Sequence, residues 1–274
     1  MLELVGPPGA PVIVALGGIS SSRHVTSSAL DPRPGWWSEF VGPRKTIDTN
    51  RFQVLGIDYC TSSEATTTQE QAAALASALD LIAAKNVRAI VGASYGGMVA
   101  LAFGALYPER VEQLVVIAAA HQSAPFATAL RILQRKIVEL GLSTGRGGEA
   151  LAIARGVAMT SYSSAQEFSE RFECADEVAE FLRLAGREFT ARCTPERFLT
   201  LSQSLDRHKV APEDIRVPST LIAVEQDALV PVDQVRELAV RIGAACKLVE
   251  ISSAHGHDTF LRAPSLIAPY VELS

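Results

Sequence analysis

A serine set among small residues is the first candidate for chemistry in this chain. The segment Gly92-Ala93-Ser94-Tyr95-Gly96 has the G-x-S-x-G spacing, which is typical of a nucleophilic serine held on a sharp turn between a strand and a helix. A short apolar run precedes the segment, and a run suited to a helix follows it. The flanking glycines let the strand and the helix approach closely. The pattern therefore predicts that Ser94 is a nucleophile that attacks acyl carbon atoms.

A nucleophilic serine needs a histidine as its base, and the histidine needs a carboxylate that orients it. In proteins with this turn the carboxylate and the histidine follow the serine in that order. Glu225 and Asp227 follow one later apolar run, and Asp227 is preferred because it begins a loop. His255 and His257 follow the next run, and His257 is preferred because a glycine precedes it and a helical segment follows. The predicted triad is Ser94, Asp227 and His257, with Glu225 and His255 as the alternatives.

Acyl transfer through a serine also requires an oxyanion hole, which is usually made of two backbone N–H groups. One donor is expected at Tyr95, which directly follows the serine. The other is expected in the loop after the first predicted strand, where two glycines stand side by side. Gly17 is the preferred second donor, and Gly18 is the alternative.

Short apolar runs alternate with helical segments over most of the chain, and these elements must position the candidate residues. The predicted strands are 12–16, 52–57, 88–93, 113–118, 220–224 and 247–251, and the predicted helices are 69–84, 97–107, 232–242 and 259–271. Strands separated by helices indicate an α/β fold with a mainly parallel sheet flanked by helices. In such sheets the active site lies beyond the carboxyl ends of the strands. Each residue of the predicted triad falls just past such an end.

The alternation stops between residues 121 and 215, where helical periodicity continues without strand signals. The helices predicted there are 129–138, 165–172, 176–189 and 195–207. We therefore expect a core formed by residues 1–120 and 216–274, with residues 121–215 inserted as a helical cap. The cap is expected to cover the pocket and to provide the interface of a homodimer.

Composition limits the classes of partner. The chain has 274 residues, 48% of them hydrophobic, and a net charge of −5, which argues against nucleic acid as the main partner. No apolar stretch reaches the length of a membrane span, and no secretory leader is recognisable, so no membrane partner and a cytoplasmic location are expected. The four cysteines show no C-x-x-C spacing, so no metal site is predicted.

Several segments of the chain, in order, resemble the homoserine O-acetyltransferase family. Gly35-Trp36-Trp37 is similar to that family's loop before the second core strand, and the segment around Ser94 is similar to its nucleophile turn. In the cap, the stretch from Phe181 to His208 resembles the family's second helical pair. Gly256-His257-Asp258-Thr259-Phe260-Leu261 closely matches its terminal motif. The resemblance implies an α/β-hydrolase fold with an inserted helical cap.

The resemblance also implies an activity. Ser94 would take an acyl group from coenzyme A and pass it to the hydroxyl of L-homoserine, in a ping-pong reaction of methionine biosynthesis. His257 would act as base and then as acid, while Asp227 holds its tautomer. Asp258 matches the position that recognises the substrate amino group, and Arg192 matches a cap arginine that pairs with the substrate carboxylate. Acetyl-CoA is the expected donor, as a co-substrate and not as a permanently bound cofactor.

The chain departs from the family pattern at places that bear on substrate choice. The loop that begins at Gly17 is not the commoner family form, and Phe198 stands where a tyrosine is expected. Succinyl-CoA as donor and L-serine as acceptor therefore remain alternatives. A simple esterase would share the same triad, and a binding protein without activity is the remaining alternative. For Asp258 the structural alternative is the N-cap of the following helix, and for Arg192 it is an exposed arginine.

Overall fold

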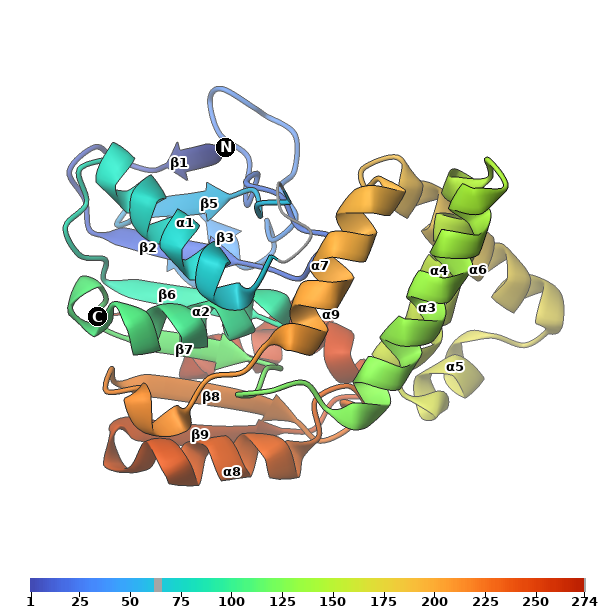
Figure 1. The fold of residues 1–274 in the computed structure, drawn as a ribbon. Helices are drawn as coiled ribbons and strands as arrows, with labels where there is room; N and C mark the ends of the chain where they lie inside the picture. Colours follow the sequence, from blue (N-terminus) through green and yellow to red (C-terminus); the bar gives the residue numbers. More distant parts are fainter. Residues whose placement is uncertain (62–65, 274) are drawn as a thin grey trace.

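A computed structural model describes residues 1–61 and 66–273 of the protein (Figure 1). Within these residues the main sheet has the strand order β1-β5-β2-β6-β7-β8-β9. All neighbouring strands run parallel except β1, which is antiparallel to β5. The strands are β1 (Leu2–Val5), β2 (Val12–Leu16), β5 (Gln53–Ile57), β6 (Ala89–Ala93), β7 (Leu114–Ile117), β8 (Ser219–Val224) and β9 (Cys246–Ile251). The predicted α/β fold with a mainly parallel sheet is confirmed.

Three short strands have no counterpart in the prediction. β1 lies at the edge of the sheet and its side chains are only half-buried, so it lacks the continuous apolar run of a central strand. β3 (Val41–Gly42) and β4 (Ile47–Asp48) form a separate small parallel pair. Strands of this length carry no readable alternation of apolar and polar residues.

Both faces of the sheet are covered, one by helices and the other mainly by loops and short turns, which explains why its central strands are apolar throughout. In β2, Val14 and Leu16 belong to a core formed with α1 (Thr68–Leu81), α2 (Tyr95–Leu106) and α8 (Val232–Ile242). The intervening Ile13 and Ala15 belong to a second core on the other face. The sheet is thus buried between two apolar layers, which fixes the direction in which each strand end points.

The predicted helix at 259–271 is wrong over most of its length. α9 (Thr259–Arg262) ends before Pro264, and the chain continues in short 3-10 turns. Proline lacks the N–H that an α-helix needs and clashes with the preceding turn, and Pro269 repeats the interruption. The 3-10 turns in the described residues are Pro108–Arg110, Pro212–Asp214, Gly243–Ala245, Gly256–Asp258, Pro264–Leu266 and Ala268–Tyr270.

The insertion between β7 and β8 is helical and stands beyond the carboxyl ends of the strands, towards which the arrows in Figure 1 point. Its helices are α3 (Pro125–Ser143), α4 (Gly147–Tyr162), α5 (Ala165–Arg171), α6 (Ala175–Thr190) and α7 (Pro195–Arg207). They all lie within the predicted insertion at 121–215. In the described part of the chain, no helix is both long and apolar enough to cross a membrane.

α4 is the cap helix that the sequence did not predict. Three glycines lie within it, and glycine disfavours an isolated helix. Close packing against its neighbours compensates for this low helix propensity. A Cβ atom at Gly141 of α3 would lie only 2.2 Å from the Cβ of Ala150, so the two helices could not approach as closely with a larger residue there. A Cβ at Gly186 of α6 would similarly lie 2.7 Å from the carbonyl oxygen of Ala152. Small residues therefore allow α4 to pack closely between α3 and α6.

Candidate active site

Ser94 lies on the turn between β6 and α2, with backbone angles of φ 54° and ψ −122°. A non-glycine residue in this conformation is strained, by about 1–3 kcal/mol. The neighbouring glycines are needed for space, because a Cβ at Gly92 would lie 2.3 Å from the carbonyl oxygen of Gly96. A Cβ at Gly96 would lie 2.3 Å from the carbonyl oxygen of Leu16. The close approach of β2, β6 and α2 holds the serine in place at the carboxyl end of β6.

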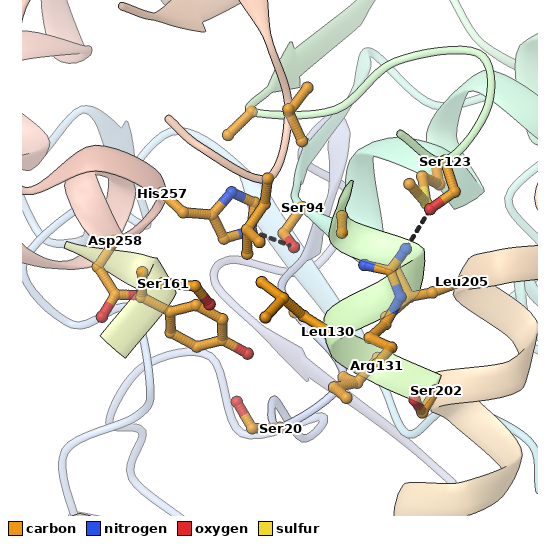
Figure 2. A pocket seen from close by; sticks show the side chains of 18 of the residues that line it. Ser20, Ser94, Ser123, Leu130, Arg131, Ser161, Ser202, Leu205, His257 and Asp258 are labelled. Atoms are coloured by element: carbon orange, nitrogen blue, oxygen red, sulfur yellow. Dashed lines mark hydrogen bonds between the residues drawn. The ribbon is translucent and has the colours of Figure 1, made fainter. Parts of the chain in front are cut away.

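The structure brings the three residues of the predicted triad together. His257 Nε2 lies 2.8 Å from Ser94 Oγ (Figure 2). His257 Nδ1 lies 2.7 Å from Asp227 Oδ2. Because a carboxylate only accepts hydrogen bonds, Nδ1 donates to Asp227 and Nε2 is left to accept the serine proton. The other carboxylate oxygen accepts from the backbone N–H groups of Leu229 and Val230, at 2.8 and 3.0 Å. Every polar atom of the triad thus has a defined partner.

The pKa of His257 is set by opposing effects. Burial lowers it, because a buried imidazolium loses solvation, but the charge and hydrogen bond of Asp227 outweigh burial, and the charge of Asp258 adds to them. The net result is a pKa above the usual value for histidine. The environment would therefore stabilise an imidazolium formed by transfer of a proton from Ser94 to His257.

The alternative acid and base lie elsewhere. Glu225 is exposed to solvent, whereas Asp227 is buried. His255 Nδ1 lies 3.1 Å from the carboxylate of Glu167 on the cap helix α5. Neither Glu225 nor His255 lines the pocket around Ser94. Among the weighed alternatives, the geometry selects Asp227 and His257.

The loop after β2 places Gly18 on the pocket wall and Gly17 behind it. The carbonyl of Gly17 accepts from the backbone N–H of Gly96 and from the hydroxyl of Tyr59, at 2.9 and 2.6 Å. A Cβ at Gly17 would lie 2.7 Å from the Trp36 ring, whereas one at Gly18 would meet no atom within 4 Å. Of the two candidate donors, Gly18 thus lines the pocket, whereas Gly17 packs against Trp36.

Tyr95 begins α2 directly after the serine. Its backbone N–H stands at the positive end of that helix and has no backbone partner in the described residues. Its side chain points into the core, where the hydroxyl lies 2.7 Å from Ser204 Oγ. The backbone N–H of Tyr95 is therefore available as an oxyanion donor, while its buried ring holds the turn in place.

Asp258 lines the pocket beside His257 and is 8% exposed. Its carboxylate does not cap α9, since no side-chain hydrogen bond is made there. Burial raises the pKa of Asp258, while the positive charges of Arg155 and His257 act in the opposite direction. A buried carboxylate without a partner in the described residues is costly, which is expected of a group that binds a ligand.

Arg192 also lines the pocket, near the end of α6. Arg192 is exposed, as its structural alternative predicted, but partial burial of its guanidinium still lowers its pKa, and the nearby charge of Arg155 lowers it further. Arg155 comes from α4 and lines the same pocket, with its guanidinium 5.1 Å from the ring centroid of Tyr162 and 5.0 Å from that of Phe189. In the described part of the chain, neither arginine forms an ion pair. Arg155, Arg192 and Asp258 thus all line one pocket.

Arg155 and Arg131 are pocket residues that the sequence analysis missed. Both lie on cap helices, where an arginine is usually solvated, so the residue type alone did not indicate a position in the pocket. Only the packing of α3 and α4 over the strand ends turns these side chains inward. Figure 2 shows Arg131 on the opposite side of Ser94 from Asp258.

Comparisons with known proteins agree with this geometry. Residues 11–264 match the α/β hydrolase fold family. The chain is 36% identical over 273 residues to the homoserine O-succinyltransferase of Xanthomonas campestris pv. campestris, covering 95% of this chain and 74% of that protein. It is 33% identical over 264 residues to the homoserine O-acetyltransferase of Thermus thermophilus, covering 84% of this chain and 69% of that protein.

A solved structure of homoserine O-acetyltransferase from Bacillus anthracis has the same fold. It matches with a TM-score of 0.88 at 17% identity, covering 98% of this chain and 90% of that chain. The resemblance predicted from the motifs is confirmed by these matches. The chain is therefore an enzyme of the α/β-hydrolase-fold family to which the homoserine O-acyltransferases belong.

Proposed function

We propose that this enzyme transfers an acyl group from acyl-CoA to the side-chain hydroxyl of L-homoserine through an acyl-serine on Ser94. In the first half-reaction, Ser94 Oγ attacks the thioester carbonyl carbon while His257 Nε2 takes its proton. The carbon–sulfur bond breaks, and His257 returns the proton to the coenzyme A sulfur. In the second half-reaction, His257 takes the homoserine hydroxyl proton, the homoserine oxygen attacks the ester carbon, and Ser94 leaves with the proton.

The remaining groups of the site would stabilise these steps. The backbone N–H groups of Tyr95 and Gly18 would hold the negative oxygen of both tetrahedral intermediates. Acetyl-CoA is the donor that the sequence resemblance implies, and a succinyl donor would undergo the same bond changes. The product would be an O-acylated homoserine, whose acyloxy group is a better leaving group than hydroxide. This agrees with the expected place in methionine biosynthesis.

The observation that carries the proposal is the charge of the pocket next to His257. Homoserine is a zwitterion, so its binding site needs one anionic and one cationic group, separated by the distance between the ammonium and carboxylate groups of the substrate. Asp258 supplies the anion beside the base, and Arg155 and Arg192 supply guanidinium groups without ion-pair partners in the described residues. Arginine binds a carboxylate well because its planar fork donates two parallel hydrogen bonds. A hydrolase of neutral esters would gain nothing from the buried carboxylate of Asp258 at this place.

Thiol release from acyl-CoA tests this function. We expect rapid release of one thiol per enzyme without an acceptor, followed by slow hydrolysis, because the cap restricts water at the acyl-enzyme. L-Homoserine should increase the steady rate steeply, and L-serine serves as the competing acceptor. A steady rate that is equally fast without any amino acid would identify an esterase instead.

Replacing Asp258 by asparagine should impair use of the acceptor. The change keeps the size of the side chain but removes its charge, so homoserine should lose about 1.5–3 kcal/mol of transition-state binding. Acylation of Ser94 by the donor alone involves no amine and should be nearly unaffected. Rapid-quench measurement of the two half-reactions separates these effects. Equal slowing of both halves would show that Asp258 supports the triad and does not bind the acceptor.

The homodimer expected from the cap is also a proposal, supported by an apolar stripe on α3. Phe126, Leu133 and Leu140 recur every seven residues, which places them on one side of the helix. Their exposed fractions are 58%, 59% and 69%. We expect light scattering to give a dimer for the wild type and a monomer for Leu133→Arg. A wild-type monomer at micromolar concentration would rule the interface out.

A further inference from the structure

A buried carboxylate of the cap contacts the loop that carries the histidine of the triad. Glu167 lies on α5, and its side chain is only 9% exposed. One of its carboxylate oxygens lies 3.1 Å from His255 Nδ1, and the other accepts a hydrogen bond from Arg262 Nη1. His255 stands shortly before His257 in the chain, and Arg262 stands shortly after it. Glu167 therefore holds the chain on both sides of the turn that carries His257.

We propose that Glu167 is a positioning residue that couples the cap to the base of the triad. The 3-10 turn Gly256–Asp258 carries both His257 and Asp258, and Figure 2 shows these two side chains at the pocket with Ser94. By holding both sides of the turn, Glu167 keeps His257 Nε2 within reach of Ser94 Oγ. This inference rests on the proposed function, because its assay follows the acylation of Ser94.

The hydrogen bonds at the start of α5 show that Glu167 is turned away from the usual local role of such a glutamate. Ser164 caps α5, and its hydroxyl accepts from the backbone N–H of Glu167 at 3.1 Å. A glutamate at this position usually accepts from the N–H of the cap residue, as Glu70 does from Thr67 in α1 at 2.7 Å. In α5 the N–H of Ser164 donates instead to the carbonyl of Ala254, at 3.0 Å. The cap residue and the carboxylate of Glu167 thus both bind the loop of the histidine.

Close packing at the same junction transmits the position of the cap to the turn. Gly256 has a φ of 52°, and a Cβ there would lie 2.7 Å from the carbonyl oxygen of Tyr162 at the end of α4. The ring of Tyr162 lies beside the imidazole of His257, with 5.7 Å between the ring centroids. A shift of this part of the cap would therefore displace His257. The contacts of Glu167 resist such a shift.

The core holds the same turn independently, so a change at Glu167 should not unfold it. Trp37 Nε1 donates to the carbonyl of Phe260 at 2.8 Å. The side-chain oxygen of Gln226 accepts from the backbone N–H of Ser253 at 2.7 Å. Without the contacts of Glu167, the turn should stay folded but be placed less precisely. A displacement of about 1 Å can slow a reaction by roughly 100-fold, so a measurable loss of rate is expected.

Glu167→Gln and Glu170→Gln form a matched pair for the test. Both make the same change on α5, but Glu170 is exposed to solvent. Glutamine has one acceptor oxygen in place of two, so one partner of Glu167 loses its acceptor. We expect the rate constant for acylation of Ser94 at saturating acyl-CoA to fall roughly 10- to 100-fold in Glu167→Gln. Glu170→Gln should match the wild type.

The concentration dependence of acylation separates positioning from other roles of Glu167. The acyl-CoA concentration that gives half of the maximal rate should be unchanged in Glu167→Gln, because Glu167 lies outside the pocket lining that the described residues form. Intact-mass spectrometry should still reach one acyl group per enzyme, only more slowly. A merely structural role would lower the unfolding temperature and leave the rate constant at the wild-type value. That result, or a change confined to the half-saturating concentration, would overturn the proposal.

Arg262→Met tests the other end of the contact. The side chain of Arg262 is 34% exposed, so its removal should be tolerated by the fold. If the two residues act as one contact, the double variant Glu167→Gln/Arg262→Met should lose no more rate than the more impaired single variant. Losses that multiply would mean that the two residues act separately, against the proposal. Glu167→Asp keeps the charge, should retain part of the rate, and replaces the glutamine variant if that variant does not fold.

The ester p-nitrophenyl acetate separates this inference from the proposed function. This activated ester can acylate Ser94 through the triad alone and requires neither coenzyme A nor homoserine. If the wild type is acylated by the ester but not by acyl-CoA, the proposed function fails, and the loss in Glu167→Gln is measured with the ester. If acyl-CoA is used at the wild-type rate by Glu167→Gln, the function stands and the positioning role is wrong. If neither compound adds mass to Ser94, both proposals fail.

Discussion

Ser94→Ala is expected to lower turnover by 10³-fold or more, on the order seen when a catalytic nucleophile is removed. The variant has no oxygen that can form the acyl-enzyme ester, so the first half-reaction cannot occur. Intact-mass spectrometry of the wild type mixed with acyl-CoA should show one added acyl group, and the variant should show none. Near-normal turnover of the alanine variant would mean that acyl transfer bypasses this serine.

The fold should tolerate this change. Alanine is no larger than serine, so the close contact among Gly92, Gly96 and β2 is preserved. Ser161→Ala is a suitable control, because Ser161 also lines the pocket but its hydroxyl donates to Ala158 of its own helix at 2.8 Å. The control should still acquire the acyl adduct. Unchanged thermal unfolding of both variants would show that loss of activity in Ser94→Ala is chemical.

The triad could be predicted because each of its residues is identified by its neighbours in the chain. Ser94, Asp227 and His257 all follow strands, and parallel strands bring their carboxyl ends to one edge of the sheet. Glycine spacing around Ser94 adds a local steric requirement that few other turns share. Local pattern and sheet topology together are therefore enough to assemble this part of the site.

The arginines could not be predicted in the same way. Arg131 and Arg155 face the pocket only because α3 and α4 pack over the strand ends, and no local pattern distinguishes them from solvated arginines. The glycines of α4 also lower the helix propensity of that segment, so the sequence does not predict the helix. Its stability comes from packing with α3 and α6. The choice between Gly17 and Gly18 depends on a shift of one residue in a loop. Such features can be identified only from the tertiary structure.

Asp227→Asn should reduce acylation by roughly 10³- to 10⁴-fold, the scale expected when the base is held in the wrong tautomer. In the wild type, the N–H groups of Leu229 and Val230 donate to one oxygen of Asp227, and the other oxygen accepts from His257. Asparagine has only one oxygen, and the two backbone donors should retain it. The amide NH₂ group must then face Nδ1 of the histidine.

This arrangement would change the tautomer of His257. Nδ1 would accept from the amide, so the proton would move to Nε2, which could no longer accept the proton of Ser94. Glu225→Gln is the matched control, because it makes the same chemical change two residues away on an exposed side chain. Its acylation rate should stay close to that of the wild type. A large loss in Glu225→Gln with little loss in Asp227→Asn would exchange the two assignments.

The pH dependence of acylation provides an independent check on Asp227. In the wild type, Asp227 keeps the pKa of His257 above its usual value despite burial. Because only neutral His257 can act as base, kcat/KM for acyl-CoA should fall as the pH drops through this raised pKa. Removing the carboxylate leaves burial to lower the pKa, so the residual activity of Asp227→Asn should persist to lower pH than that of the wild type. An unchanged acid limb in the variant would mean that Asp227 does not set the charge of the base.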